Sequence, residues 1–297
     1  MISPQECKEC CIDQIRRLAI LLGTDQQHVL EAFEKDFANG EPKTAPEYAE
    51  LIFREFSKLT GIDDPYKEVK ESSNLEAQKL IANIEAELNK KFSGLKKFIE
   101  LAVVGNVIDY GAFKEVHIGQ FVDEALLAPY FKFDIKELEQ DLNKAKTVLY
   151  IADNAGEIIF DRLLLEYIHS LGKNVTVAVR GGPIINDVTF IDAEFAKLHD
   201  FAEVISTGSR IPGILLKRCS KEFFQKYMEV DLVISKGQGN FETLYCMERQ
   251  KPKKLYYLFV VKCQTVANLL TGAHIGNKVL MKGATLPMEA TKNSLTK

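Results

Sequence analysis

The apolar residues in the first part of the chain recur at the spacing of amphipathic helices. The spacing predicts two helices within residues 10–36, broken near Gly23, and further helices at 49–59, 69–88, 95–104, 120–128 and 135–145. No alternating pattern typical of a strand lies among the helices before residue 104. We therefore predict that the chain begins with a helical bundle.

After Lys146 the pattern changes to short apolar runs, most of them separated by helical or mixed segments. These runs lie at residues 148–152, 175–179, 202–205, 232–234 and 255–261. Short apolar strands that alternate with helices are typical of a parallel sheet covered on both faces. A chain of 297 residues also favours two domains. We predict an N-terminal helical-bundle domain at residues 1–135 and a Rossmann-like three-layer α/β/α domain with a mostly parallel sheet at residues 136–297.

Charge and hydropathy narrow the classes of partner. The formal net charge is -4 and the basic residues are dispersed, so a nucleic-acid groove is not expected. No apolar run is long enough to span a bilayer, and the first residues lack the basic and apolar regions of a signal peptide. We therefore expect a cytoplasmic protein with no nucleic-acid and no membrane partner.

The six cysteines are too sparse for a disulfide scaffold, which fits a reducing compartment. Cys7, Cys10 and Cys11 lie together near the start of the chain, and the spacing Cys7-x-x-Cys10 is compatible with a metal or a redox disulfide. No second CxxC and no nearby histidine completes a set of four ligands. We favour thiols that pack at the start of a helix.

Polar clusters follow three of the predicted strands. The first is Asp153 to Glu157, the second begins at Arg180 and includes Asp187, and the third runs from Ser235 to Glu242. In an open parallel sheet, ligands bind beyond the carboxyl ends of the strands, which lie at one edge. The three clusters should therefore converge on a single site.

These clusters combine groups that can hold a hard cation with groups that can hold an anion. Asp153, Asn154 and Asp187 offer the oxygen ligands that magnesium-like ions prefer, and they leave positions for water and phosphate oxygens. Lys236 and backbone amides near residues 237–239 can hold phosphoryl oxygens. The predicted catalytic residues are Asp153, Asn154, Asp187 and Lys236. Further residues of the clusters that we predict to contact substrate are Glu157, Arg180, Gly237 and Gln238.

Taken singly, each cluster also has an ordinary structural explanation. Asp153 or Asn154 after a strand is typical of a helix cap, and Gly181 to Pro183 is typical of a plain turn. Lys236 can be a solvated charge, and the GxG pattern at Gly237 lacks the third glycine of the dinucleotide fingerprint. The occurrence of all three clusters at strand ends favours a site. The five histidines are scattered outside these clusters, so neither a histidine-dependent hydrolase nor a zinc site is expected.

The chain resembles the metal-dependent damage-control phosphatases, a family long filed as a domain of unknown function, in the ordered segments DNAGEIIFDRLL, VRGGPIINDVTFIDA, DLVISKGQGNFETL and VKC. It is most similar to the stand-alone prokaryotic branch, whose members tend to carry a CxxC followed by glutamine, a DPY element and a GNxIDxG segment. These features lie here at Cys7 to Gln14, at Asp64 to Tyr66 and at Gly105 to Gly111. The chain departs from the family pattern at Ala152, where many relatives have glycine, and at Val261, and neither position is a metal ligand.

The resemblance implies a helical domain and a Rossmann-like domain, in agreement with the hydropathy pattern. It also implies a divalent ion, which is Mn²⁺, Co²⁺, Ni²⁺ or Mg²⁺, held by Asp153, Asn154 and Asp187. Lys236 then belongs to a phosphate-binding loop. The further substrate-binding residues that the resemblance implies are Asn240, Asn106 and Asp109.

The sequence therefore predicts a metal-dependent phosphomonoester hydrolase that acts on small phosphorylated metabolites, either sugar phosphates or damaged cofactor intermediates. The metal would polarise the phosphoryl group and activate water, and Lys236 would offset charge on the phosphoryl oxygens. Asp153 is compatible with a role as ligand only, or also as nucleophile or base. Two alternatives stay open: methyl transfer from S-adenosylmethionine, which Rossmann-like sheets often bind, and a metal or ligand sensor without catalysis.

Overall fold

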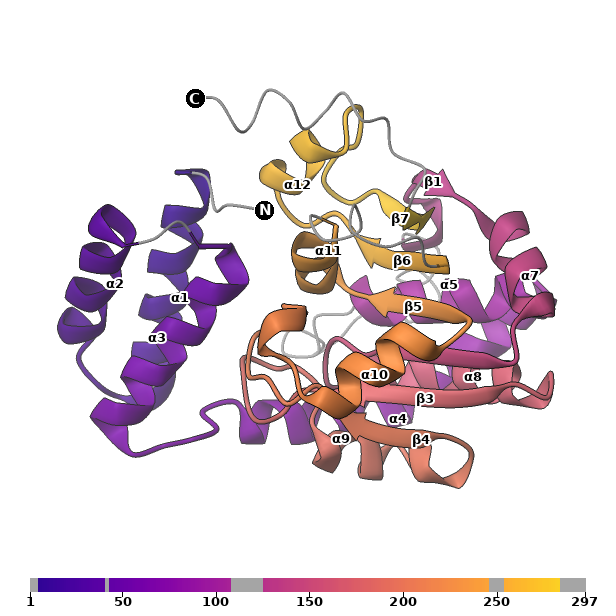
Figure 1. Cartoon of the computed structure of the whole chain (residues 1–297), viewed down its shortest axis with the longest axis horizontal. Helices are drawn as coiled ribbons and strands as arrows, with labels where there is room; N and C mark the ends of the chain where they lie inside the picture. The colour runs from indigo at the N-terminus through magenta and orange to yellow at the C-terminus, as the bar shows by residue number, and fades with distance from the viewer. Residues whose placement is uncertain (1–4, 41–42, 108–124, 246–253, 284–297) are drawn as a thin grey trace.

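In the part of the chain that the structure describes, seven strands form one sheet (Figure 1). The computed structural model describes residues 5–40, 43–107, 125–245 and 254–283. The strand order is β1-β7-β6-β5-β2-β3-β4, and every neighbouring pair is parallel except β6 with β7. The strands are β1 (Tyr130–Phe133), β2 (Thr147–Ile151), β3 (Asn174–Val179), β4 (Glu203–Ser206), β5 (Leu232–Lys236), β6 (Lys254–Val260) and β7 (Lys278–Lys282). The predicted mixed α/β class with a mostly parallel sheet is confirmed.

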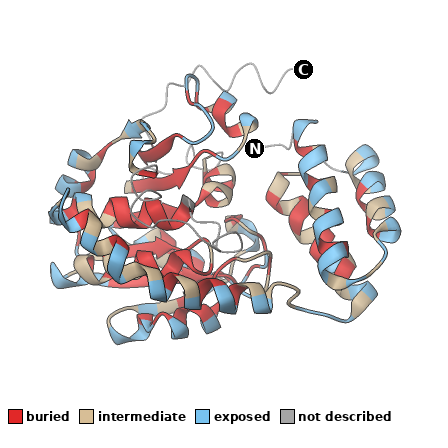
Figure 2. Ribbon diagram, turned by 180° about the vertical axis from the view of Figure 1, so that it is seen from behind, coloured by how far each residue is buried: buried red, intermediate tan, exposed pale blue. Residues whose placement is uncertain are grey.

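The sheet has an apolar core on each face, because alternate residues of a strand point to opposite sides. In β2, Val148 and Tyr150 contribute to one core, whereas Leu149 and Ile151 contribute to the other. The first core also contains residues of α4 (Lys67–Asn89), α5 (Gly94–Val107), α7 (Ile135–Lys144), α8 (Glu157–Ser170) and α9 (Phe190–Phe195). The second contains residues of α10 (Lys221–Glu229), α11 (Gln238–Leu244) and α12 (Gln264–Leu269). Figure 2 shows the central strands buried and the helices buried on their inner sides.

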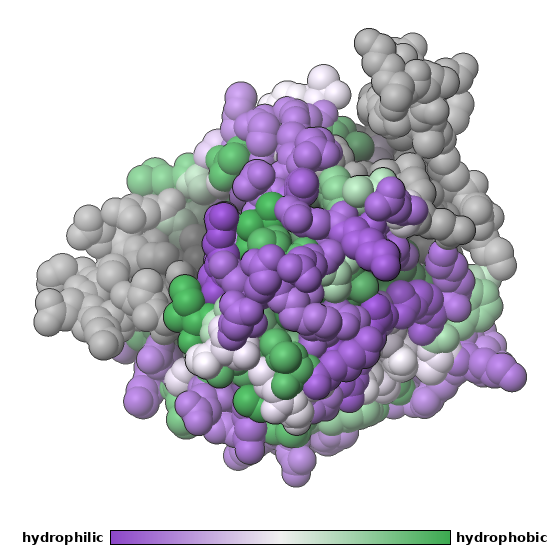
Figure 3. Space-filling model, turned by 90° about the vertical axis from the view of Figure 1, so that its left-hand side faces the viewer, coloured by the Kyte–Doolittle hydropathy of each residue, from purple (hydrophilic) through white to green (hydrophobic). Residues whose placement is uncertain are grey.

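Three N-terminal helices share a core of their own. They are α1 (Glu6–Leu22), α2 (Gln27–Asn39) and α3 (Ala45–Thr60), and they lie side by side at the left of Figure 1. The core is formed by side chains such as Ile15, Phe33 and Phe56, which are completely buried. The outer face of these helices is largely hydrophilic (Figure 3), as expected for amphipathic helices packed on one another.

The loop after β3 joins this three-helix core to the sheet. Ile184, which is almost completely buried, packs within the core of α1, α2 and α3, and Ile185 packs against it. Two ion pairs link the segment after β4 to the same region: Arg218 pairs with Glu50 of α3 at 2.7 Å, and Arg210 pairs with Asp63, which follows α3. The three helices therefore contact the loop that carries Asp187, one of the predicted metal ligands.

Two strands, β1 and β7, were not predicted. The segment of β7 begins and ends with lysine, so it does not form a clear apolar run. Lys278 is nevertheless buried, because its ammonium pairs with Glu100 of α5 at 3.2 Å and donates to the carbonyl of Leu126 at 3.1 Å. The division into domains at residue 135 and the Rossmann-like layering stay predictions, and we note that α4, α5 and β1 lie N-terminal to residue 135 and pack with the sheet.

Candidate active site

The ends of β2, β5 and β3 bring the predicted polar clusters together, because these three strands are neighbours in the sheet. The turn after β2 pairs directly with the segment after β3. Asn154 and Asp187 form an antiparallel bridge, and the amide of Val188 donates to the carbonyl of Asp153 at 2.8 Å. The amide of Ala155 likewise donates to the loop after β3 at 2.8 Å. Backbone hydrogen bonds therefore hold the three predicted metal ligands in adjacent segments.

Two of these predicted ligands are buried carboxylates. Asp153 is 7% exposed and Asp187 is 3% exposed. Burial raises the pKa of Asp187 to about 7, the Arg180 guanidinium opposes this rise, and the negative charge of Asp153 adds to it. Arg180 Nε donates to Asp187 Oδ2 at 2.6 Å. A site in which two buried carboxylates repel each other favours a bound cation.

Gly237 allows the third cluster to approach Asp153 closely. A Cβ atom added at Gly237 would lie 2.0 Å from Cγ of Asp153, and the backbone φ of Gly237 is +85°. Only glycine fits both the close contact and this backbone conformation. The sequence predicted a substrate contact for Gly237; the structure places the residue against the carboxylate of Asp153, and the substrate contact stays a prediction.

Lys236, the residue before Gly237, forms a buried ion pair with Glu157. Both side chains are almost completely buried, and Asn106 Nδ2 of α5 donates to both carboxylate oxygens of Glu157 at 2.9 Å. Asn106 is itself fixed, because its Oδ1 accepts from the amide of Val260 at 3.1 Å. Burial lowers the pKa of the Lys236 ammonium well below its usual value, while the Asp153 carboxylate acts in the opposite direction. The predicted residues Lys236, Glu157 and Asn106 are therefore close together.

Arg180 and Asn240 also lie in this region, and their side chains form hydrogen bonds with other residues of the chain. Arg180 donates to Asn240 Oδ1 at 2.9 Å and to the carbonyl of Gly213 at 3.3 Å. Asn240 Nδ2 donates to the carbonyls of Lys236 at 2.6 Å and Ala152 at 3.2 Å. These contacts hold the turns after β2, β3 and β5 at fixed separations.

Gln238 and Asp109 are two further residues that the sequence predicted to contact substrate, and the structure describes the first of them only. The amide group of Gln238 donates to Glu242 at 2.8 Å, and its oxygen accepts from the backbone amide of Lys262 at 2.8 Å. Asp109 lies outside the described residues. The contacts of Gln238 and Asp109 with substrate stay predictions.

Sequence reasoning missed three buried polar residues near the site. Asp161 follows Glu157 by one helical turn, and its Oδ1 lies 3.4 Å from Lys236 Nζ. Lys70 of α4 lies close enough to Asp187 for its charge to oppose the rise in that pKa. Asn74 accepts a hydrogen bond from the amide of Gly156 at 2.6 Å. The spacing of Asp161 from Glu157 was a usable signal, whereas nothing local marked the residues of α4.

The donor set fits a cation that prefers oxygen ligands. It consists of two carboxylates and the amide of Asn154, whose Nδ2 lies 2.7 Å from Asp153 Oδ2 and 3.2 Å from Glu157 Oε2. Rotation of this amide by half a turn would present its oxygen in the same direction. Within the described residues, no cluster of three or more His, Cys, Asp or Glu side chains is arranged to hold a metal ion, so the set requires this amide.

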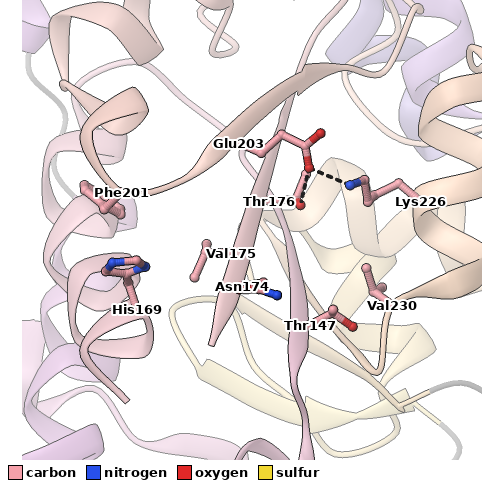
Figure 4. A pocket seen from close by; sticks show the side chains of 9 residues that line it. All are labelled: Thr147, His169, Asn174, Val175, Thr176, Phe201, Glu203, Lys226 and Val230. Carbon is pink, nitrogen blue, oxygen red and sulfur yellow. Dashed lines mark hydrogen bonds and ion pairs between the residues drawn. The ribbon is translucent and has the colours of Figure 1, made fainter. Parts of the chain in front are cut away.

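A hollow lies at the amino-terminal ends of the strands, opposite the polar clusters (Figure 4). It measures about 440 Å³ and is lined by the first residues of β2, β3 and β4, which are Thr147, Asn174 and Glu203. Glu203 accepts from Thr176 at 3.0 Å and pairs with Lys226 at 2.5 Å. The hollow is remote from the polar clusters, which follow the carboxyl ends of the strands.

The fold and the site define an α/β protein with buried carboxylates at the carboxyl edge of a mostly parallel sheet. The chain belongs to the damage-control phosphatase ARMT1-like domain family, whose model matches residues 3–277. The family resemblance predicted from the motifs is confirmed.

Individual relatives match nearly the whole chain. A damage-control phosphatase of Pyrococcus horikoshii is 35% identical over 276 residues, which are 89% of this chain and 93% of that protein. An uncharacterized protein of Methanocaldococcus jannaschii is 35% identical over 291 residues, which are 93% of this chain and 94% of that protein. The crystal structure of a DUF89 family protein from Pyrococcus horikoshii has a TM-score of 0.83 at 32% identity and covers 95% of this chain and 99% of that chain. The family model and the damage-control phosphatase of Pyrococcus horikoshii support a phosphatase role. In the described part of the chain, no helix has the length and apolar composition needed to cross a membrane.

Proposed function

We propose that this protein is a divalent-metal-dependent phosphatase that hydrolyses small phosphorylated metabolites, such as sugar phosphates or damaged cofactor intermediates. The observation that carries the proposal is the pair of buried carboxylates, Asp153 and Asp187, held side by side on paired segments next to Gly237. Buried like charges are costly unless a cation or protons neutralise them. Membership of a family of damage-control phosphatases supports the choice of reaction.

Asp153, Asn154 and Asp187 would hold the ion, which is Mn²⁺, Co²⁺, Ni²⁺ or Mg²⁺. When bound, such an ion supplies a Lewis acid that polarises a phosphoryl oxygen and lowers the pKa of a bound water. Ions of this kind usually take more ligands than these three side chains supply, so coordination positions would remain for water and phosphate oxygens.

The chain's own residues orient these groups. Arg180 fixes the direction of the Asp187 carboxylate through a hydrogen bond of 2.6 Å and favours its ionised form. Gly237 permits the close approach of Asp153. Lys236 is paired with Glu157 beside Asp153; burial lowers the pKa of its ammonium, and the Asp153 carboxylate opposes that shift. In the proposed reaction the ionised form of Lys236 offsets the negative charge that develops on the phosphoryl oxygens.

The proposal is tested by phosphate release from a panel of sugar phosphates and phosphorylated cofactor fragments. The protein is freed of metal with a chelator and assayed with and without each divalent ion. We expect turnover only with metal, and a loss of about 10²-fold or more in Asp153→Ala and Asp187→Ala, since removal of an electrostatic contributor commonly costs this much. Glu203→Gln is the matched control and should retain turnover, because Glu203 lies at the amino-terminal end of β4, opposite the site.

Full metal-dependent turnover in both alanine variants would refute the assignment. Thermal unfolding separates the remaining alternatives, because a ligand that binds the native state raises its stability. Stabilisation by Mn²⁺ with phosphate supports the phosphatase, and stabilisation by S-adenosylmethionine contradicts it. Binding of phosphorylated compounds without product would point to a sensor.

A further inference from the structure

A buried amide side chain of helix α4, that of Asn74, contacts the turn after β2, which carries two of the proposed metal ligands. Asn74 is 3% exposed, and its Oδ1 accepts from the backbone amide of Gly156 at 2.6 Å. Gly156 is buried, precedes α8 and has a φ of +77°. Its amide is one of those that a helix leaves without a partner at its N-terminal end. The partner is supplied by a residue 82 positions earlier in the chain.

The other end of the same amide reaches the second ligand segment. Asn74 Nδ2 donates to Asp192 Oδ1 at 2.9 Å. The remaining oxygen of Asp192 accepts from the amide and the hydroxyl of Thr189, each at 2.8 Å. Thr189 lies two residues after Asp187. Asn74 therefore connects the segment after β2 with the segment after β3, and both connections are buried.

The chemistry of this link is directional. An amide side chain presents an acceptor oxygen on one side and a donor NH2 group on the other, and here the oxygen accepts from a backbone N–H while the NH2 group donates to a carboxylate. Aspartate at position 74 would keep the acceptor and lose the donor, and two carboxylates would then face each other. Lys70, one turn earlier on α4, lies 3.9 Å from Asp192 and pairs with Asp64 at 2.8 Å, so one ammonium is shared by two carboxylates and does not neutralise a third.

We propose that Asn74 is a positioning residue for the metal site, which fixes the separation of the Asp153–Asn154 turn from Asp187 without contacting the ion. This inference rests on the proposed function, since it takes those three residues as the metal ligands. Groups that orient metal ligands from outside the coordination sphere typically change metal affinity by about 10- to 100-fold when removed. We expect a change of that size at Asn74.

The test is the dissociation constant for Mn²⁺, measured on the full chain without substrate, by electron paramagnetic resonance of free Mn²⁺. Asn74→Asp should bind Mn²⁺ at least about 10-fold more weakly than the natural protein. In the double variant Asn74→Asp/Asp192→Asn, donor and acceptor exchange places at constant net charge, and affinity should return to within about 3-fold of the natural value. Asn83→Asp makes the same change at an exposed position of α4 and should leave affinity unchanged.

A second measurement does not depend on metal. Hydrogen exchange of the Gly156 amide should be faster in metal-free Asn74→Ser than in the natural protein, because its acceptor is removed. Unchanged exchange in Asn74→Ser would overturn the inference even if Asn74→Asp does not fold. Natural Mn²⁺ affinity in folded Asn74→Asp, or no recovery in the folded double variant, would also overturn it. Failure of the natural protein to bind any divalent ion would instead refute the proposed function, and the inference with it.

Discussion

The contact between Gly237 and Asp153 yields a sharp prediction. In Gly237→Ala, the new Cβ would lie 2.0 Å from Cγ of Asp153 and 2.1 Å from its Oδ2. Carbon atoms that are not bonded make their best contact at roughly 3.5–4.0 Å, so the Asp153 carboxylate must move by at least about 1 Å. A displacement of about 1 Å in a reacting group can cost about 10²-fold in rate. The substitution should therefore weaken Mn²⁺ binding and lower kcat/KM by about 10²-fold.

The same substitution also strains the backbone. Gly237 has φ +85° and ψ +156°, a region that is essentially restricted to glycine. A side chain there costs about 1–3 kcal/mol of folding free energy, which chemical unfolding can measure. Gly276→Ala is the matched control, because Gly276 has φ +88° and no heavy atom within 4 Å of the added Cβ. It should lose stability and retain turnover. Gly237→Ala with natural Mn²⁺ affinity and turnover would refute the reasoning.

Two further predictions follow from pKa values that burial has raised. Metal binding requires the ionised form of Asp187, whose pKa is about 7, so Mn²⁺ affinity should be about 10-fold higher at pH 8 than at pH 6. Isothermal titration at both pH values tests this, and equal affinities would contradict it. Burial also raises the pKa of Cys11 to about 12, whereas Cys10 is exposed, so iodoacetamide should label Cys10 well before Cys11 in the native protein. Mass spectrometry measures the order of labelling, and labelling of Cys11 before Cys10 would contradict the prediction. Denatured protein, in which both thiols react, is the control.

Local signals were sufficient for the strands that end at the site. The segment of β2 is a short apolar run stopped by Asp153, and β5 is a similar run followed by Gly237. Both segments are buried on two faces, so their residues need no alternating pattern. Because neighbouring parallel strands end at one edge, the convergence of Asp153, Asp187 and Lys236 also followed from the order of the elements.

The hydrogen-bond and ion-pair partners of the polar side chains could not be predicted from the local sequence. Lys236 was predicted to face phosphoryl oxygens, and its ammonium pairs with Glu157 in the structure. Asn106 was placed near the pocket by resemblance, whereas its hydrogen bonds to Glu157 and Val260 appear only when α5 packs against α8 and β6. A buried polar group takes the partner that packing brings to it, and spacing along the chain does not encode that partner.

The sequence by itself determined the mixed α/β class, the family and the sheet edge at which Asp153, Asn154 and Asp187 meet, because apolar period and turn residues act over a few positions. Only the tertiary structure decided that α4 and α5 lie against the sheet, that Gly237 touches Asp153 and that Asn74 joins the two ligand segments. These contacts link residues far apart in the chain. Their energies come from burial and from satisfied hydrogen bonds, which exist only once the elements have packed together.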